Sequence, residues 1–163
     1  MKWYIPFILL AVGSSAKAQD SGFGLGFMLG EPTGISGKYW LGGDKAMDFG
    51  VAWGLWHGGY VHVHADYLFH KMELINVGKG RLPLYFGPGL RMRSWNDGRY
   101  WKHGRYYDHE GSRMDIAVRF PVGVAYLFDG APVDVFLEIV PTLNIAPGTW
   151  MEFDAALGAR YWF

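Results

Sequence analysis

Apolar residues alternate with small or polar ones along almost the whole of residues 22–163, and this period of two constrains the fold more than any other feature. Such alternation is typical of a β-strand with two different faces. It recurs in eight segments, and none shows the 3.6-residue period of an amphipathic helix. The segments are residues 22–30, 35–41, 47–56, 60–70, 82–93, 114–128, 133–143 and 150–163. The sequence therefore predicts an all-β fold.

The length and number of the segments predict an eight-stranded antiparallel up-and-down transmembrane β-barrel. A tilted strand crosses a bilayer in ~9–11 residues, and an even number of strands closes the sheet without an edge. If both ends of the chain are periplasmic, the connections 31–34, 57–59, 94–113 and 144–149 are extracellular. The connections 42–45, 71–81 and 129–132 then lie on the periplasmic side.

The two faces of the segments differ in composition, and the difference predicts which one points outward. One face is almost uniformly apolar, whereas the other holds Gly and Ala interrupted by single charges. Gly makes a poor solvent-facing strand but suits a narrow lumen. Because an unpaired buried charge costs several kcal/mol, we expect a paired network that plugs the lumen. The expected lumen residues are Lys38, Asp48, His62, His64, Asp66, Arg91, Arg93, Asp115, Arg119, Asp134, Glu138, Glu152, Asp154 and Arg160.

The N-terminal residues have the pattern of a secretory signal peptide. Lys2 precedes a short apolar core, and Ala16-Lys17-Ala18 fits an A-x-A cleavage site. We expect residues 1–18 to be a cleaved leader and 19–163 to be a single outer-membrane barrel domain. The chain has no Cys, so it forms no disulfide and has no thiolate chemistry. Thirteen basic residues remain against 15 acidic ones once Lys2 and Lys17 are removed, which gives no indication of nucleic-acid binding.

The C-terminal residues end the last segment on an aromatic side chain. Gly158, Tyr161 and Phe163 form a G-x-x-Y-x-F ending, with Tyr161 and Phe163 on the apolar face. With the leader and eight segments, this ending resembles the small OmpA/OmpX-type outer-membrane barrels, whose last strand is read by the barrel assembly machinery. Residues 29–40 and 82–87 resemble an uncharacterised family of such barrels. The resemblance implies an outer-membrane location and lipid as a partner, and it brings no catalytic motif.

The longest connection, residues 94–113, is the candidate binding surface. Aromatic and cationic side chains are enriched where proteins bind partners. An ordinary polar hairpin tip is the alternative, and the favoured one. The candidate surface residues are Trp95, Tyr100, Trp101, Tyr106 and Tyr107, and the possible partner is an extracellular ligand.

The segment 60–70 carries a candidate metal site. His62, His64 and Asp66 share one strand face, and a His-x-His pair can chelate a metal with a third ligand from a neighbour. The alternative is a hydrogen-bonded network in which Arg91 or Arg119 pairs with Asp66. We favour that alternative and expect no cofactor.

A structural or adhesive role is the predicted function, and two other classes stay open. A lipid-modifying enzyme could use Ser94 or Ser112 with His103, His109 and Asp108, or Glu138 with Asp154 as a carboxylate pair. Neither serine lies in a nucleophile motif such as G-x-S-x-G, so the sequence around them does not support a catalytic triad. A soluble lipocalin-like binding barrel would have its apolar face inward.

Overall fold

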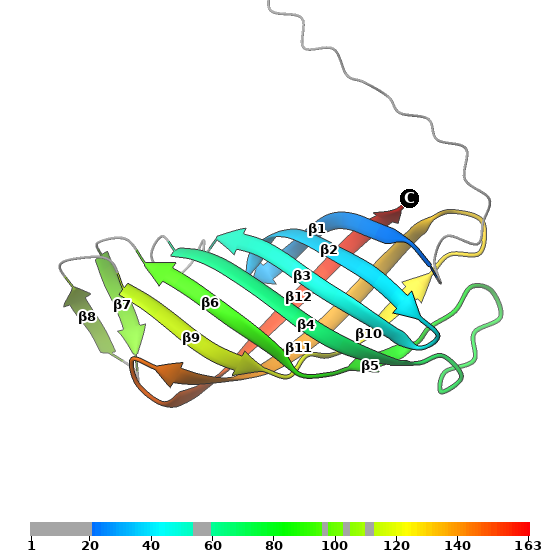
Figure 1. Cartoon of the computed structure of the whole chain (residues 1–163). Coiled ribbons are helices and arrows are strands. Elements are labelled where there is room, and N and C mark those ends of the chain that lie inside the picture. The colour runs from blue at the N-terminus through cyan, green and yellow to red at the C-terminus, as the bar shows by residue number, and fades with distance from the viewer. Residues whose placement is uncertain (1–20, 54–59, 96–97, 103–104, 110–112) are drawn as a thin grey trace, which may run out of the picture.

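The computed structural model describes residues 21–53, 60–95, 98–102, 105–109 and 113–163 and contains an all-β closed barrel (Figure 1). The predicted fold class is confirmed. Its strands are β1 (Phe23–Glu31), β2 (Thr33–Gly42), β3 (Lys45–Trp53), β4 (Tyr60–Lys71), β5 (Leu84–Phe86), β6 (Gly89–Trp95), β9 (Arg113–Arg119), β10 (Val122–Leu127), β11 (Val133–Ala146) and β12 (Trp150–Trp162). A separate two-stranded sheet is formed by β7 (Gly98–Lys102) and β8 (Arg105–His109).

Antiparallel pairing runs around the whole barrel. The order is β10-β5-β4-β3-β2-β1-β12-β11-β9-β6, and the pairings β10–β11 and β4–β6 complete the ring. β1 and β12 close the barrel in a register that runs from Gly24↔Trp162 to Glu31↔Ala155. Within the described residues, no helix is long and apolar enough to cross a membrane.

Two of the predicted segments are each interrupted by a proline. Segment 82–93 divides into β5 and β6 at Gly87-Pro88, and segment 114–128 divides into β9 and β10 at Phe120-Pro121. Proline has no N–H to donate to the ladder, so the pairing breaks there. Each pair of strands continues along one line of the barrel, because the Tyr67 N–H donates to Pro88 O at 2.8 Å and the Gly87 N–H to Pro121 O at 3.2 Å. The barrel is therefore eight-stranded, with two broken strands.

The apolar face points outward around the ring. Exposed apolar side chains lie on each of the barrel strands, from Phe27 (71%) on β1 to Phe153 (69%) on β12. Aromatic pairs lie at the ends of three strands, with ring centroids 4.7–5.2 Å apart and edge-to-face geometry. They are Tyr67–Phe69, Tyr126–Phe128 and Tyr161–Phe163.

Glycines on the inner face stand directly opposite large inner side chains. A Cβ at Gly158 would lie 2.3 Å from the ring of Phe136, its partner in the β11–β12 register. A Cβ at Gly50 would lie 2.4 Å from the ring of His64, its partner in the β3–β4 register. Gly24 and Gly123 have the same relation to Trp162 and Tyr85. The glycines on this face therefore provide the room that bulky side chains need in an eight-stranded barrel.

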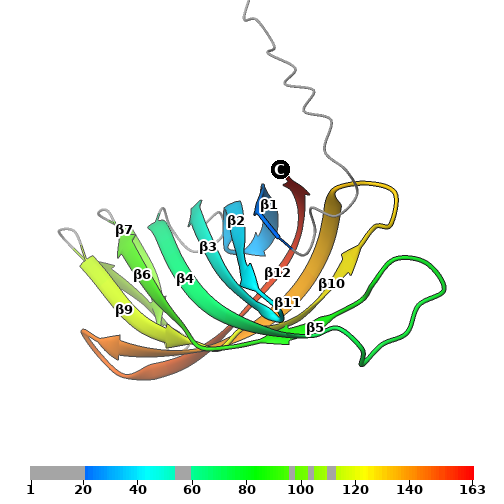
Figure 2. The same cartoon turned by 45° about the vertical axis from the view of Figure 1, so that its right-hand side comes forward.

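The two ends of the barrel differ. The turn between β2 and β3, the turn between β10 and β11, the connection between β4 and β5, and the C-terminus all lie at one end (Figures 1 and 2). The β7–β8 sheet lies at the other end (Figure 1). At the C-terminal end, the buried rings of Trp40 and Trp162 stack at 6.1 Å, and Met72 packs against them. These side chains therefore pack against one another inside the barrel at that end.

Candidate functional site in the barrel interior

The strand alternation places the charged side chains of the inner face inside the barrel. Arg91 and Arg119 are each 1% exposed, and the other cations and most carboxylates of this face are also buried. The buried charged residues are Lys38, Asp48, Asp66, Arg91, Arg93, Asp115, Arg119, Asp134, Glu138, Asp154 and Arg160. Glu152 is only partly buried. Their contacts form three linked clusters along the barrel axis.

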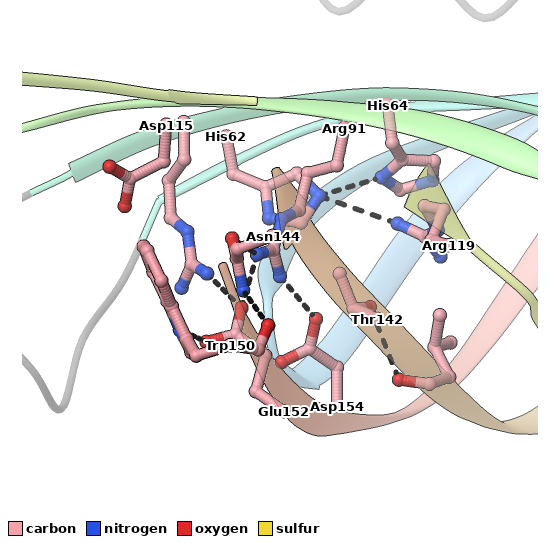
Figure 3. Close-up of polar contacts among 12 residues, drawn as sticks. His62, His64, Arg91, Asp115, Arg119, Thr142, Asn144, Trp150, Glu152 and Asp154 are labelled. Atoms are coloured by element: carbon pink, nitrogen blue, oxygen red, sulfur yellow. Dashed lines mark hydrogen bonds and ion pairs between the residues drawn. The ribbon is translucent and has the colours of Figure 1, made fainter. Parts of the chain in front are cut away.

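The first cluster lies toward the end of the barrel at which β6 leads to β7. Arg91 is at its centre (Figure 3). Nη1 of Arg91 donates to Asp154 Oδ2 at 2.9 Å, and Nη2 donates to Asn144 Oδ1 at 2.6 Å. Glu152 contacts both Arg91 and Arg93 and accepts a hydrogen bond from Trp150 Nε1 at 3.3 Å. Four strands, β6, β9, β11 and β12, are held together in this cluster, since Trp95 Nε1 also donates to Asp115 Oδ2 at 3.1 Å.

The second cluster lies at mid-height and joins β4, β9 and β11. Nε of Arg119 forms an ion pair with Asp66 Oδ1 at 3.1 Å, and its Nη2 reaches Glu138 Oε1 at 3.5 Å. The hydroxyl of Tyr85 donates to Glu138 Oε2 at 2.9 Å. Of the two pairings considered for Asp66, the structure thus has the one with Arg119.

The third cluster lies next to the stacked rings of Trp40 and Trp162. Nη1 of Arg160 donates to Asp48 Oδ2 at 2.5 Å, and its Nε donates to Asp134 Oδ1 at 3.1 Å. Trp162 Nε1 donates to the other oxygen of Asp134 at 3.0 Å. Lys38 Nζ lies 2.6 Å from His70 Nε2 and 4.8 Å from the centroid of the Tyr85 ring. The cations of this cluster therefore each have a defined partner.

The predicted metal residues are only partly brought together. His64 and Asp66 lie beside Asp48, with one candidate ligand atom of each within 4.8 Å of the others. His62 is not part of this group, because its Nε2 lies 3.0 Å from Nδ1 of His64, on the far side of that ring. The group that the strands assemble is therefore Asp48, His64 and Asp66.

The candidate binding residues of the 94–113 connection are placed by their backbone. Tyr100 is paired with Tyr107, and Trp101 with Tyr106, in the β7–β8 register. Trp95 is half-buried at the end of β6, where its ring lies 4.6 Å from that of Tyr60. The side chains of Tyr100, Trp101, Tyr106 and Tyr107 lie outside the described part of the chain.

The catalytic alternatives have no assembled site among the described residues. Ser112 and His103 lie outside the described residues, as do the side chains of Asp108 and His109. Glu138 and Asp154 are held by different partners, Glu138 by Tyr85 and Arg119, and Asp154 by Arg91. They therefore do not form a carboxylate pair that faces a substrate cavity.

The expected lumen set was chosen by charge, so it missed several members of the clusters, among them Asn144 and His70. Asn144 and His70 both lie on the inner face, buried to 0% and 2% exposure, and bond to Arg91 and Lys38. Their even spacing from Thr142 and Asp66 is the signal that could have found them.

Comparisons with known proteins support the fold and a family. A family model described as "Protein of unknown function (DUF3996)" matches residues 14–161. The crystal structure of the N-terminal β-barrel domain of Pseudomonas aeruginosa OprF is similar, with a TM-score of 0.56 and 16% identity. The similarity covers 86% of this chain and 95% of that domain. A search of curated proteins finds no significant match.

Proposed function

We propose that this chain, which belongs to the DUF3996 family, is an outer-membrane β-barrel with a structural role, a closed lumen and an external binding hairpin. The outer surface is the observation that carries the proposal. Large apolar side chains are exposed on every barrel strand, among them Phe27, Leu157 and Phe153 at 71%, 52% and 69%. A continuous apolar belt far exceeds the patches that monomeric soluble proteins expose, and a closed barrel is one of only two folds that can span lipid.

The distribution of polar groups disfavours the soluble binding barrel. A lipocalin-type barrel holds its ligand in an apolar interior. In the described part of this chain the interior contains three ion-paired clusters, and the apolar side chains are outside. The same interior argues for a plug and against a pore, because Trp40, Met72 and Trp162 also pack together at one end.

The route to the membrane is part of the proposal. Residues 1–18 would serve as the leader, although they lie outside the described residues. The barrel assembly machinery would engage β12, where Tyr161 and Phe163 face outward at 41% and 59% exposure. Lipid of the outer membrane is then the partner of the apolar belt.

Cell fractionation and gel migration test the location. We expect the chain in the outer-membrane fraction, and we expect an unboiled sample to migrate faster than a boiled one, because a folded barrel resists detergent. A mature protein that stays folded and monomeric without detergent, or that fractionates with soluble proteins, would contradict the proposal.

The β7–β8 hairpin is proposed to bind an extracellular partner. Its register sets aromatic residues opposite each other at two successive positions, Tyr100↔Tyr107 and Trp101↔Tyr106, next to Arg99 and Arg105. Aromatic residues and Arg are the types that dominate binding energy at interfaces. The hairpin is not part of the barrel sheet, so it can vary without affecting the closure of the barrel.

The absence of Cys gives a direct test of which end is outside. We expect Asp97→Cys, in the connection before β7, to react with a membrane-impermeant maleimide on intact cells. Ala131→Cys, in the turn between β10 and β11, is the matched control and should react only after lysis. The reverse pattern would contradict the proposed orientation.

Binding itself is tested by comparing two strains of cells. One displays the natural chain, and the other a variant in which residues 98–109 are replaced by a short Gly/Ser linker. Both are applied to a glycan array and to a panel of immobilised extracellular proteins. Retention that depends on the hairpin supports a binding role, and equal behaviour of both strains on every surface argues against it.

A further inference from the structure

The geometry around His64 points to a metal-binding function of the lumen: we propose that Asp48, His64 and Asp66 bind one Zn²⁺ ion. The three ligands come from the adjacent strands β3 and β4. Nε2 of His64 lies 3.8 Å from Asp48 Oδ1 and 4.0 Å from Asp66 Oδ2, and all three atoms lie within 4.8 Å of one another. Imidazole and carboxylate are ordinary zinc ligands.

The separations suit a shared ion better than direct contacts. Both exceed the length of a hydrogen bond, so His64 Nε2 bonds directly to neither carboxylate. Zinc–nitrogen and zinc–oxygen bonds of about 2.1 Å place two tetrahedral ligand atoms about 3.4 Å apart. The two carboxylate oxygens would need to move toward His64 by about 0.4 Å and about 0.6 Å. They would also need to approach each other from their present separation, which is within 4.8 Å.

Each carboxylate divides its two oxygens between an arginine and the proposed ion. Asp48 uses Oδ2 for Arg160, at 2.5 Å, and turns Oδ1 toward His64. Asp66 lies 3.1 Å from Arg119 through Oδ1 and turns Oδ2 toward His64. The arginines thus fix the orientation of both ligands, as outer-shell partners do in metal sites.

His62 acts as a positioning residue for His64. Its Nε2 lies 3.0 Å from Nδ1 of His64, so an Nδ1–H on His64 can be donated to it. That tautomer leaves the Nε2 lone pair facing the two carboxylates, and metal-binding histidines are commonly oriented by such a bond. Gly50, opposite in the register, leaves the space that the His64 ring occupies.

The charge around the site also favours a cation. Asp48 and Asp66 are direct partners in the β3–β4 register, and like charges in such positions repel. Among the described side chains of the second and third clusters, four carboxylates face three cations. The carboxylates are Asp48, Asp66, Asp134 and Glu138, and the cations are Lys38, Arg119 and Arg160. A bound cation between Asp48 and Asp66 removes their repulsion.

Folding the barrel with the metal present tests the site, because the closed lumen can slow entry into a preformed barrel. The mature chain, stripped with chelator, is folded in detergent with equimolar Zn²⁺, passed through a desalting column and analysed for metal. We expect about one Zn²⁺ retained per folded chain. Co²⁺ in its place, with water as the fourth ligand, should give the absorption bands of a low-symmetry, four-coordinate ion.

Variants separate this site from other histidines. His64→Ala and Asp48→Asn should each lower retained metal at least 10-fold, and His62→Ala should weaken affinity about 10- to 100-fold. His70→Ala is the matched control, because His70 is equally buried in the lumen but is not in the group. It should retain metal as the natural chain does. Faster migration of unboiled samples shows which variants fold, and Asp48→Asn preserves the shape of its side chain if His64→Ala does not fold.

Three results would overturn the proposal. In the first, the folded natural chain retains no more metal than empty detergent micelles do. In the second, the folded His64→Ala or Asp48→Asn variant retains as much metal as the natural chain. In the third, His70→Ala loses the metal to the same extent as His64→Ala. None of these readouts depends on the location of the barrel in the cell, so they are independent of the proposed function.

Discussion

At the scale of single residues, the stability of this barrel depends on charges that are buried and shared. Arg160 is 2% exposed and bonds to Asp48, Asp134 and Ser36, while its guanidinium lies 4.1 Å from the centroid of the Phe136 ring. We expect Arg160→Met to lower the free energy of unfolding by about 3–5 kcal/mol, because two buried carboxylates lose their cation. Urea titration of the barrel in lipid vesicles measures this change.

Lys71→Met is the matched control for Arg160→Met. Lys71 is exposed at the end of β4, so losing its charge should change stability by no more than about 0.5 kcal/mol. A loss below about 1 kcal/mol for Arg160→Met would mean that the third cluster does not hold the strands together.

The positions of the lumen residues could be predicted from the sequence, but most of their partners could not. The alternation of side chains between the two faces of each strand is enough to place Arg91 inside the barrel. Its partners Asp154 and Asn144 are 63 and 53 residues away, and finding them requires the stagger between strands that are not adjacent in sequence. The metal group shows the same limit. His62, His64 and Asp66 share a face, but only the β3–β4 register reveals that Asp48, and not His62, lies beside His64 and Asp66.

At the scale of elements, the barrel and the β7–β8 hairpin are separate structures. The two strands pair only with each other among the described residues, whereas β6 and β9 pair directly from Gly89↔Arg119 to Trp95↔Arg113. The period of two predicted the barrel strands well, because one face of each is apolar. It did not indicate β7 and β8, where aromatic and charged residues follow one another without that contrast.

Replacing residues 98–109 by a short Gly/Ser linker should therefore leave the barrel folded. We expect the free energy of unfolding to change by less than about 1 kcal/mol, since no ladder of the barrel sheet is removed. The comparison is made by urea titration and by gel migration with and without boiling. A variant that no longer folds would show that the hairpin contributes to the barrel itself.

At the scale of the whole molecule, the proposed plug predicts that the barrel does not conduct ions. Three clusters of paired charges occupy the described interior, and Trp40, Met72 and Trp162 pack together at one end. We expect no steady conductance when the purified barrel is added to a planar bilayer, under conditions in which an open porin gives clear steps. Reproducible steps from the natural chain would contradict a closed lumen.

The apolar belt makes a second prediction for the whole molecule, because a bilayer has a midplane and an aqueous solvent does not. Leu157 lies near the middle of β12 and faces outward, and Tyr161 faces outward near its end. An arginine on the lipid face costs about 2–4 kcal/mol at the midplane and about 0–1 kcal/mol near the interface. Leu157→Arg should therefore lower the stability of the barrel in vesicles by about 2–4 kcal/mol, and Tyr161→Arg by about 1 kcal/mol or less. Equal and small effects at both positions would mean that the outer face does not meet lipid, because only a hydrocarbon layer makes the cost of a charge depend on its depth.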